Sequence, residues 1–275
     1  MKALTFKIRF FTAQFKDHTS KMVRKTYLIP PPSAVAGIFG AITGLKRDRL
    51  AGLGDRMMAG AELISLGGRI VTLARLFKLD RTRRELSTLL RKYYTGSYSG
   101  EKGGEWVLRG IAELLTIKES EELYMPEYKF AIALGGGAEP LLEEGLRRLR
   151  DLDFEYEVFG GNDYHFVESI GDPRRAEVYN SRDGHGYCPR EDLERIETES
   201  FNIAYGVSAI GGAGPIIMPA TFLVRARGEG VDAKAIDYIQ VYGARIIAKR
   251  ELTVVDDGES KIFVYEVAPF LVAQI

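Results

Sequence analysis

Three consecutive prolines constrain this chain more than any other feature of its sequence. They lie in Tyr27–Gly44, YLIPPPSAVAGIFGAITG, and run directly into a serine and a segment of small apolar residues. Proline fixes its own φ and disfavours helix in the residue before it, so we expect extended chain before Ser33. Ser33 is then a natural N-cap for a helix over Ser33–Gly44, contributing roughly 1 kcal/mol. The N–H groups at that helix start would form an anion site, although the same residues also suit a plain buried helix.

The segments around this helix predict a small sheet. Apolar and polar residues alternate in the first segment, as they do in a half-buried strand. The elements expected in chain order are strand Lys2–Phe10, helix Ser33–Gly44, a polar helical stretch around Lys46–Met58, extended segments Ala61–Leu66 and Ile70–Leu79 about a Gly67–Gly68 turn, strand Tyr128–Leu134, helix Pro140–Leu149 and strand Phe154–Phe159. This pattern indicates a βαββαβ unit of the ferredoxin-like or RRM-like kind.

An insertion and a C-terminal region complete the expected organisation. Residues Asp80–Glu122 predict a helix at Arg83–Tyr94, a Gly/Ser/Tyr loop and a second helix at Trp106–Leu115. Residues from Gly160 onward predict mainly short strands. We therefore expect an α+β chain, with a ferredoxin-like domain over 1–160 that carries an inserted thumb at about 80–122. A smaller β-rich region would occupy 161–275.

Charge and cysteine content limit the classes of function. The 38 Lys and Arg residues balance 38 Asp and Glu residues, which counts against an autonomous nucleic-acid binder. The charge is uneven, however, since Arg69–Lys92 holds eight basic residues against two acidic ones. A single cysteine, Cys188, cannot form an internal disulfide and fits a reducing cytosol. Lys2 leads directly into an alternating strand, so we expect no signal peptide and a cytoplasmic protein. Phe201–Val224 has no charge, but its glycines and prolines indicate buried strand and loop, and no membrane contact is expected.

Motifs for cofactor or metal chemistry are not found in the sequence. The Gly135–Gly137 turn lacks the G-x-G-x-x-G spacing, and no phosphate-binding GxxxxGK[ST] motif occurs. The three histidines, His18, His165 and His185, are scattered and have no zinc-ligand spacing. We therefore predict neither a cofactor nor a metal.

RNA contact has more candidate residues. Arg24 and Lys25 precede the first helix near its positive end, and we expect both, together with Ser33 at the start of that helix, to contact RNA. Cations alternate with aromatic rings, as unpaired nucleic acid requires, at Arg91, Lys92, Tyr93, Tyr94 and Tyr98. A Gly-Gly turn is followed by Asn162, Asp163 and His165, which would meet base edges. Two alternatives stay open for the insertion: its tyrosines would pack in a core, or its leucines would dock on a neighbouring protein.

A ribonuclease that needs no metal is the competing enzyme hypothesis. Histidine titrates near neutral pH and can act with tyrosine or lysine as acid and base. The candidates are His165 with Tyr164, or His18 with Lys16 or Lys21. Lone histidines are more often structural, so whether the chain is an enzyme stays open and binding is favoured.

The order of these motifs resembles a known family. Strand Lys2–Phe10, the Arg24–Lys25 loop and PPPSAVAGIFGAITG are similar to the start of the fifth Cas protein family, the RAMP-type Cas-five subunits of type I Cascade complexes, as in subtypes I-A and I-B. Later stretches agree, namely MPEYKFAIAL (Met125–Leu134), FGGNDYHFVESIG (Phe159–Gly171) and the Gly-rich run Gly206–Pro215.

The resemblance implies a structural crRNA-binding subunit in antiviral defence. Such a subunit grips the 5′ handle of the crRNA, caps the filament of backbone subunits and contacts the large subunit, so that target DNA is met only indirectly. Its thumb touches the guide between handle and spacer. One branch of the family contains a member that cuts guide-RNA precursors, but its catalytic trio cannot be placed on this sequence. Processing of CRISPR precursor RNA is therefore the alternative function.

Overall fold

The structure is a computed structural model that describes residues 1–17, 19, 23–77, 87–88, 90–92, 94–95, 115–162, 164–198, 215–225 and 233–267. The chain divides into two units. Unit 1 contains Met1–Thr19, Lys25–Ile70 and Glu122–Ile275, and unit 2 contains Ser20–Arg24 and Val71–Glu121. Both sides of the boundary expected at residue 160 lie in unit 1. Within the described residues, no helix has the length and apolar content needed to span a bilayer.

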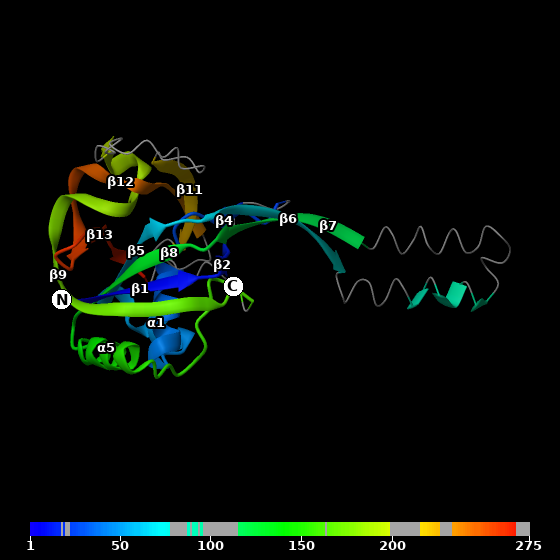
Figure 1. Cartoon of the computed structure of the whole chain (residues 1–275), viewed down its shortest axis with the longest axis horizontal. Coiled ribbons are helices and arrows are strands. Elements are labelled where there is room, and N and C mark those ends of the chain that lie inside the picture. The colour runs from blue at the N-terminus through cyan, green and yellow to red at the C-terminus, as the bar shows by residue number, and fades with distance from the viewer. Residues whose placement is uncertain are drawn as a thin grey trace. The chain divides into compact units, whose positions relative to one another are not determined.

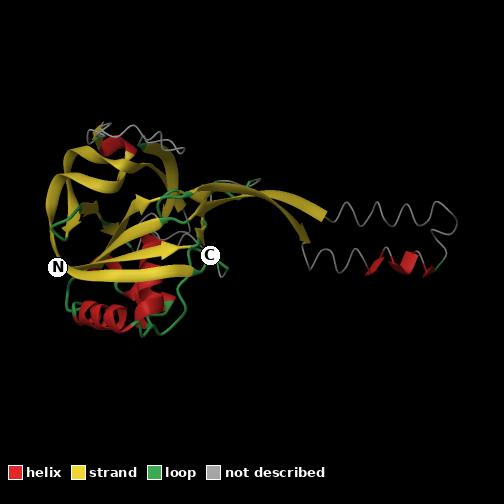
Figure 2. Ribbon diagram, in the orientation of Figure 1, coloured by secondary structure: helices red, strands yellow, loops and turns green. Residues whose placement is uncertain are grey.

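The described secondary structure is mixed α/β and mostly strand (Figure 2). The strands are β1 (Lys2–Phe10), β2 (Thr12–Ala13), β3 (Phe15–Lys16), β4 (Thr26–Tyr27), β5 (Met57–Ser65), β6 (Gly68–Phe77), β7 (Leu115–Tyr124), β8 (Glu127–Leu134), β9 (Val167–Pro189), β10 (Leu193–Glu197), β11 (Ile216–Arg225), β12 (Ala233–Asp256), β13 (Lys261–Phe263) and β14 (Tyr265–Glu266). The helices are α1 (Pro32–Thr43), α2 (Arg47–Gly52) and α5 (Pro140–Asp151), with single 3-10 turns at Gly54–Arg56 and Arg190–Asp192.

Four strands of unit 1 form the sheet on which both long helices pack. They lie in the order β9-β1-β8-β5, and each is antiparallel to its neighbours. Along the chain, β1, α1, β5, β8, α5 and β9 follow a βαββαβ order, and α1 and α5 cover the same face (Figure 1). The alternation expected in β1 is confirmed, because Leu4, Phe6, Ile8 and Phe10 are all buried in the main core.

The strand that closes this unit is not the predicted one. The sequence predicts it at Phe154–Phe159, but the described backbone there contains only a single bridge, between Phe159 and Phe166. The reason is that this segment bonds to the end of α1: the Tyr156 N–H donates to the Ala41 carbonyl at 2.9 Å. The fourth position in the sheet is taken by β9 instead.

The stretch before α1 is fixed by buried hydrogen bonds. Gln240 of β12 is fully buried, and its side chain accepts from the Leu28 N–H (2.9 Å) and donates to the Ile29 carbonyl (2.6 Å). The Tyr128 hydroxyl donates to the Leu28 carbonyl at 3.0 Å. Because buried backbone groups need such partners, these bonds hold the entry to the helix in one conformation.

The start of α1 corrects one expectation. Pro31 holds the N-cap position in an extended conformation, without a side-chain cap, and Pro32 is the first helical residue. Ser33 therefore lies inside the first turn, and the prediction that it caps the helix is wrong. Proline at the first helical position loses nothing, because its missing N–H would have no partner there, so the helix begins one residue early.

The other face of the sheet packs against the C-terminal strands. Ala3, Ala131 and Ala133 form a cluster with apolar residues from the end of the chain, Val255, Ile262 and Val264. The approach is very close at Gly60, where an added Cβ atom would lie 2.1 Å from the Phe263 carbonyl oxygen. Small side chains on this face therefore admit a second layer of backbone.

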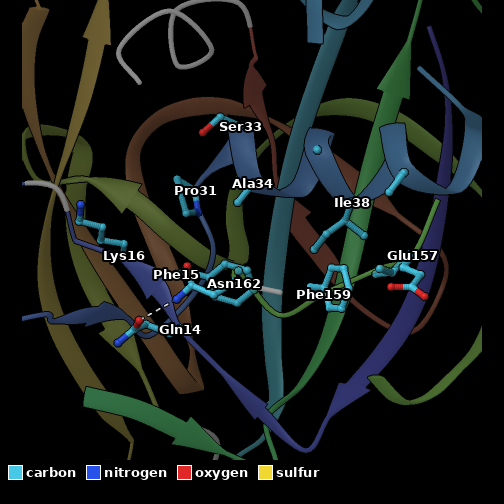
Figure 3. Close-up of a pocket in the computed structure, with 14 residues that line it drawn as sticks. Gln14, Phe15, Lys16, Pro31, Ser33, Ala34, Ile38, Glu157, Phe159 and Asn162 are labelled. Carbon is cyan, nitrogen blue, oxygen red and sulfur yellow. Dashed lines mark hydrogen bonds between the residues drawn. The ribbon is translucent and has the colours of Figure 1, made fainter. Parts of the chain in front are cut away.

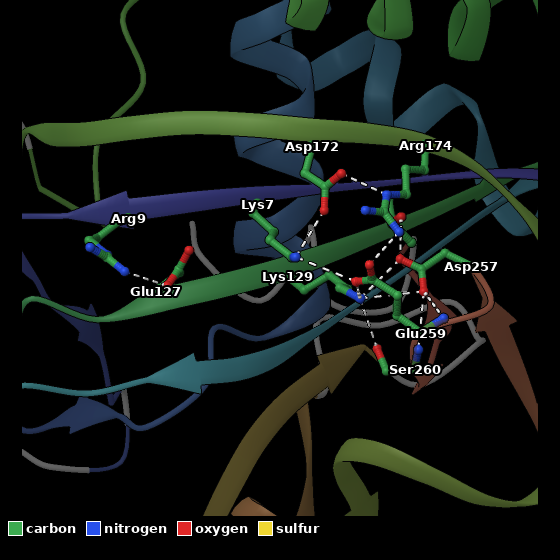
Figure 4. A network of polar contacts seen from close by, with 10 residues as sticks. Lys7, Arg9, Glu127, Lys129, Asp172, Arg174, Asp257, Glu259 and Ser260 are labelled. Atoms are coloured by element: carbon green, nitrogen blue, oxygen red, sulfur yellow. Dashed lines mark hydrogen bonds and ion pairs between the residues drawn. The ribbon is translucent and has the colours of Figure 1, made fainter.

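A polar network lies on the same face of the sheet, between β1, β8 and the C-terminal strands (Figure 4). The Lys129 ammonium lies 3.0 Å from the Asp257 carboxylate, and these side chains are only 4% and 1% exposed. The Thr5 hydroxyl donates to Asp257 at 2.9 Å, and Glu259 also pairs with Lys129 at 3.1 Å. At the half-exposed edge of the network, Lys7 pairs with Asp172 at 2.9 Å. The loop between β12 and β13 is thus attached to β1 and β8 by charged contacts.

The expected insertion is described in part. Helical backbone occurs at residues 87–88, 90–92 and 94, as predicted for Arg83–Tyr94. The second expected helix, Trp106–Leu115, lies outside the described residues except for Leu115. That residue begins strand β7, which continues to Tyr124 and pairs in a three-stranded sheet with β2 and β6. The C-terminal end of the insertion is therefore a strand, where the sequence analysis predicts none.

Candidate nucleic-acid interface

A pocket of about 470 Å³ lies in unit 1 beside the first turns of α1 (Figure 3). Three segments that are distant in sequence form it. The β2–β3 stretch contributes Gln14, Phe15 and Lys16, α1 and its entry contribute Pro31, Ser33, Ala34, Gly37, Ile38 and Ala41, and the segment after α5 contributes Glu157, Val158, Phe159, Gly161 and Asn162. Ser33 and Asn162, both predicted from the sequence to contact RNA, are brought together at this pocket.

The Gly160–His165 turn is held against the β2–β3 stretch. The Gln14 N–H donates to the Gly160 carbonyl at 2.8 Å, and Nδ2 of Asn162 donates to Oε1 of Gln14 at 2.8 Å. Gly161 has φ +112°, and an added Cβ atom there would lie 2.0 Å from the Gln14 carbonyl oxygen. Only glycine fits so close an approach, so the Gly-Gly pair is what allows Asn162 to reach Gln14.

His165 lies beneath this turn and is fully buried. Its ring Nδ1 atom is 2.7 Å from the Thr12 hydroxyl, and the backbone N–H of His165 donates to the Asn162 carbonyl at 3.1 Å. The neighbouring Tyr164 is 49% exposed, and its ring centroid lies 4.2 Å from that of His165. The histidine thus supports the turn from inside, while the tyrosine ring is half in contact with solvent.

The pocket combines apolar walls with a few polar groups. Phe15 and Ile38 are buried in its wall, and the half-buried ring of Phe159 lies alongside. Lys16 and Glu157 are exposed at the rim, so one cation and one anion can meet a ligand. A concave site that joins apolar walls to a few placed polar groups is typical of small-molecule and cofactor sites.

The anion site expected at the start of α1 has fewer donors than the sequence suggests. Pro32 has no N–H, and the N–H groups of Ala34 and Val35 both donate to the Pro31 carbonyl, at 2.9 Å and 3.2 Å. The helix dipole still favours negative charge at this end. The remaining contribution to phosphate binding therefore has to come from side chains such as Lys16.

The Arg24–Lys25 pair does not line the pocket. Arg24 belongs to unit 2, where its N–H donates to the Glu119 carbonyl at 2.8 Å and its carbonyl accepts from the Glu121 N–H at 2.9 Å. Lys25 belongs to unit 1 and is exposed, and its carbonyl accepts from the Asp17 N–H at 2.8 Å. Both residues thus lie on chain that is fixed by backbone hydrogen bonds.

The cation–tyrosine series of the insertion is described in part, within unit 2. Arg91, Lys92 and Tyr94 are exposed on helical backbone, and Tyr94 is 81% exposed. An aromatic ring so far exposed is not packed in a core. Tyr93 and Tyr98, which complete the series, lie outside the described residues, as do Asp163 and His18.

His185 and Cys188, which are not catalytic candidates in the sequence, also lack a suitable arrangement for catalysis. His185 lies 3.3 Å from the Glu62 carboxylate, on strands that belong to the sheet and not to the pocket. Burial raises the pKa of the Cys188 thiol to about 12, so that thiol is protonated at neutral pH and is a poor nucleophile. Among the residues that the structure describes, no three His, Cys, Asp or Glu side chains gather closely enough to hold a metal.

Several residues of the pocket were not predicted as RNA contacts. Gln14 lies between the predicted first strand and first helix, and Glu157 and Phe159 lie in the segment predicted as a strand. Lys16 is suggested in the sequence only as a partner for His18. The polar residues next to the Gly-Gly turn are the one local signal for this site. The register that pairs Gln14 with Asn162 is a tertiary contact across 148 residues, which a local pattern does not contain.

Comparison of the chain with known proteins finds a matching family model. A family model described as CRISPR-associated protein (Cas_Cas5) matches residues 3–199. Curated proteins gave no match. Among solved structures, a CRISPR RNA-guided surveillance complex chain shares 11% identity at a TM-score of 0.43, over 90% of this chain and 91% of that one. A CRISPR protein from Archaeoglobus fulgidus shares 11% identity at a TM-score of 0.47, over 97% and 100%. The family model covers well over half of the chain, and it alone indicates the family.

Proposed function

Since this chain belongs to the Cas5 family of CRISPR-associated proteins, we propose that it is a structural subunit that binds the 5′ handle of crRNA in a type I Cascade complex. The subunit would cap the backbone filament and contact the large subunit, and it would meet target DNA only through the assembled complex. The insertion, with Arg91, Lys92 and Tyr94, would serve as the thumb on the guide. Such a protein acts in the cytoplasm on RNA and needs neither cofactor nor metal.

One observation carries this proposal: the pocket beside α1 joins Ser33 and Asn162 to the cation Lys16. Single-stranded RNA is held by cations on its phosphates and by flat or apolar surfaces on its bases. The pocket offers both within unit 1. We interpret the sheet order β9-β1-β8-β5, with two helices on one face, as a ferredoxin-like unit, an arrangement that supports RNA binding in RRM-type proteins.

A titration of repeat RNA at several salt concentrations tests the proposal. We expect affinity to fall with salt, with a log–log slope of roughly −0.7 for each phosphate that the protein neutralises. The Lys16→Ala variant should make this slope shallower by about that amount. Lys234→Ala, which removes an exposed lysine of β12 away from the pocket, is the matched control and should leave it unchanged. Binding that does not respond to salt, or is equal for any polyanion, would contradict the proposal.

The double variant Arg24→Ala, Lys25→Ala tests the loop before α1 in the same assay. Loss of two phosphate contacts would reduce the slope by roughly 1.4. A slope equal to that of the wild type would remove this loop from the interface while leaving the pocket in place.

The ribonuclease alternative has a simple discriminating experiment. Repeat RNA is incubated with the protein and EDTA, and the products are separated by length. We expect no specific cut, because the ring of His165 is buried against Thr12 and would have to be uncovered to reach RNA. Specific cleavage that is lost in His165→Ala but kept in His185→Ala would favour the enzyme.

A further inference from the structure

We infer that the pocket beside α1 receives one unstacked nucleobase of the bound RNA and selects a base with an exocyclic amino group, cytosine over uracil among the pyrimidines. The inference rests on the proposed function and adds a ligand and a preference to it. Its basis is the size of the pocket, its walls, and the kind of polar atom that it presents.

The size and walls of the pocket suit one base and not a run of bases. About 470 Å³ lies within the range of small-molecule sites, roughly 300–1,000 Å³. Phe15, Ile38 and Pro31 supply buried apolar surface, and Phe159 adds an aromatic ring at the opening. A base splayed out of its strand finds there the contacts that stacking otherwise provides.

The pocket lining presents two hydrogen-bond acceptors, an amide oxygen and a carboxylate. Asn162 donates one Nδ2 hydrogen to Gln14 at 2.8 Å, so its amide offers a ligand the acceptor Oδ1 and the second Nδ2 hydrogen. Glu157 is exposed on the pocket lining and has only acceptors when it is ionised. A base edge that presents N–H groups matches both side chains.

Glu157 also argues against a pocket that is meant only for phosphate. A carboxylate repels phosphate oxygens, and its presence in a pure phosphate site would weaken binding. On a base edge the same carboxylate is favourable, because Glu and Asp accept from the 4-amino group of cytosine and Asn accepts from the amino group of adenine. Lys16 at the rim is then the cation for the adjoining phosphate.

Oligocytidine and oligouridine RNAs of equal length test the inference with the full chain. The two bases have nearly the same size, and they differ where cytosine carries an amino donor and uracil a carbonyl acceptor. We expect oligocytidine to bind about tenfold more tightly, the effect of one good hydrogen bond to a charged acceptor. Oligoadenosine compared with purine riboside RNA, which lacks the amino group, should show the same direction.

Variants locate the preference. Asn162→Leu and Glu157→Gln should each bring the two affinities toward equality, because each removes or weakens an acceptor. Asn180→Leu and Glu177→Gln change the same residue types at exposed positions of β9 and should leave the tenfold ratio intact. Glu157 is exposed, so Glu157→Gln is expected to fold and completes the test if Asn162→Leu does not.

The outcomes separate this inference from the proposed function. Equal, salt-dependent binding of both RNAs to the wild type would overturn the inference and leave the function standing. A cytosine preference that persists unchanged in both pocket variants would also overturn it, since another surface would then read the base. Failure to bind repeat RNA at all would contradict the proposed function, and the inference with it.

Discussion

Gly161 is the residue on which the geometry of the pocket depends most directly. Its φ of +112° is open to glycine alone, and a Cβ atom would meet the Gln14 carbonyl oxygen at 2.0 Å. A residue held in a strained backbone conformation costs roughly 1–3 kcal/mol. We expect Gly161→Ala to lower the free energy of unfolding by at least that amount. Chemical denaturation measures this change, and RNA affinity should fall with it because Asn162 loses its place.

The matched control for Gly161→Ala is Gly137→Ala. Gly137 has φ +85° but nothing within 4 Å of an added Cβ atom, so that variant has the strain without the collision. The difference between the two variants isolates the contact with Gln14. Equal destabilisation, with RNA affinity kept in both, would show that the close approach of the turn to Gln14 does not shape the pocket.

Asp257 is the second residue whose loss should be large. Burial alone would raise the pKa of this carboxyl, but hydrogen bonds from the Ser260 amide and the Lys129 ammonium outweigh burial and hold the pKa below its usual range. Asp257→Asn leaves the buried Lys129 with only the half-exposed Glu259 as its anionic partner within the network. We expect a loss of about 3 kcal/mol in unfolding free energy, the lower end for breaking a buried ion pair. Urea denaturation at neutral pH gives the value.

The same carboxyl predicts a pH dependence with a definite sign. Because its folded pKa is depressed, ionised Asp257 stabilises the fold above its unfolded pKa of about 3.9, and this contribution disappears as pH falls through the folded pKa. The difference in stability between wild type and Asp257→Asn should therefore be constant above roughly pH 5 and shrink below pH 4. A difference that grows on acidification would refute the assignment. Glu259→Gln, at the exposed edge of the network, is the milder comparison.

At the scale of elements, α1 shows how a helix start can differ from its sequence signature. Ser33 lies in the first turn and does not cap, so Ser33→Ala loses no capping bond and places a better helix former in the helix. We therefore expect the unfolding free energy to change by less than about 0.5 kcal/mol. A capping serine would cost roughly 1 kcal/mol instead. Thermal denaturation distinguishes these values, and a loss of the larger size would show that the Ser33 side chain does cap the helix in solution.

Replacement of Gly37 on the same helix is expected to raise the stability of the protein. Gly37 is an exposed interior position with nothing within 4 Å of an added Cβ atom, so Gly37→Ala should stabilise the protein by about 0.5–1 kcal/mol. Gly37 also lines the pocket, and a methyl group there narrows the space for a base. We expect weaker RNA binding by a more stable protein. Gly52→Ala, at the end of α2 and outside the pocket, is the control that should leave RNA binding unchanged.

Elements with strong local signals are predictable from the sequence, and those defined by partners are not. The alternation of Leu4, Phe6 and Ile8 is local, and that strand appears where the sequence places it. The helix after the prolines is also found, although it begins at Pro32 and is not capped by Ser33. Phe154–Phe159 has an apolar pattern suitable for a strand, but its backbone is bonded to the end of α1. The start of β9 is polar, with Glu168 and Asp172, because this edge of the sheet is only partly buried. Periodicity does not distinguish such a strand from a loop.

Only part of the pocket can be predicted from the sequence. Ser33 and Asn162 stand out in the sequence because proline and glycine punctuate the chain beside them. Gln14 and Glu157 do not, since their place in the site follows from a long-range register between the β2–β3 stretch and the segment after α5. Charge counting also points to the insertion, although it says nothing of how cations are arranged in space.

At the scale of the whole molecule, Gly60 controls how the C-terminal strands meet the sheet. A Cβ atom there would lie 2.1 Å from the Phe263 carbonyl, and backbone has little freedom to move away. We expect Gly60→Ala to destabilise unit 1 by roughly 1–3 kcal/mol, the usual cost of overpacking. Gly52→Ala, with open space around it, should be neutral or stabilising. Circular dichroism during thermal unfolding compares the two, and equal midpoints would show that this contact is not tight.

The length of β9 has a consequence for anyone who wishes to exchange parts of this protein with a relative. Residues up to Ala176 pair with β1, and residues from Glu177 onward pair with β12, so one continuous strand serves both regions. A chimaera joined near residue 160 therefore takes its fourth core strand from the donor of the C-terminal half. The crossover that keeps each hydrogen-bond ladder with its own parent lies at Ala176–Glu177, sixteen residues beyond the point that a division of the chain into two consecutive blocks would select.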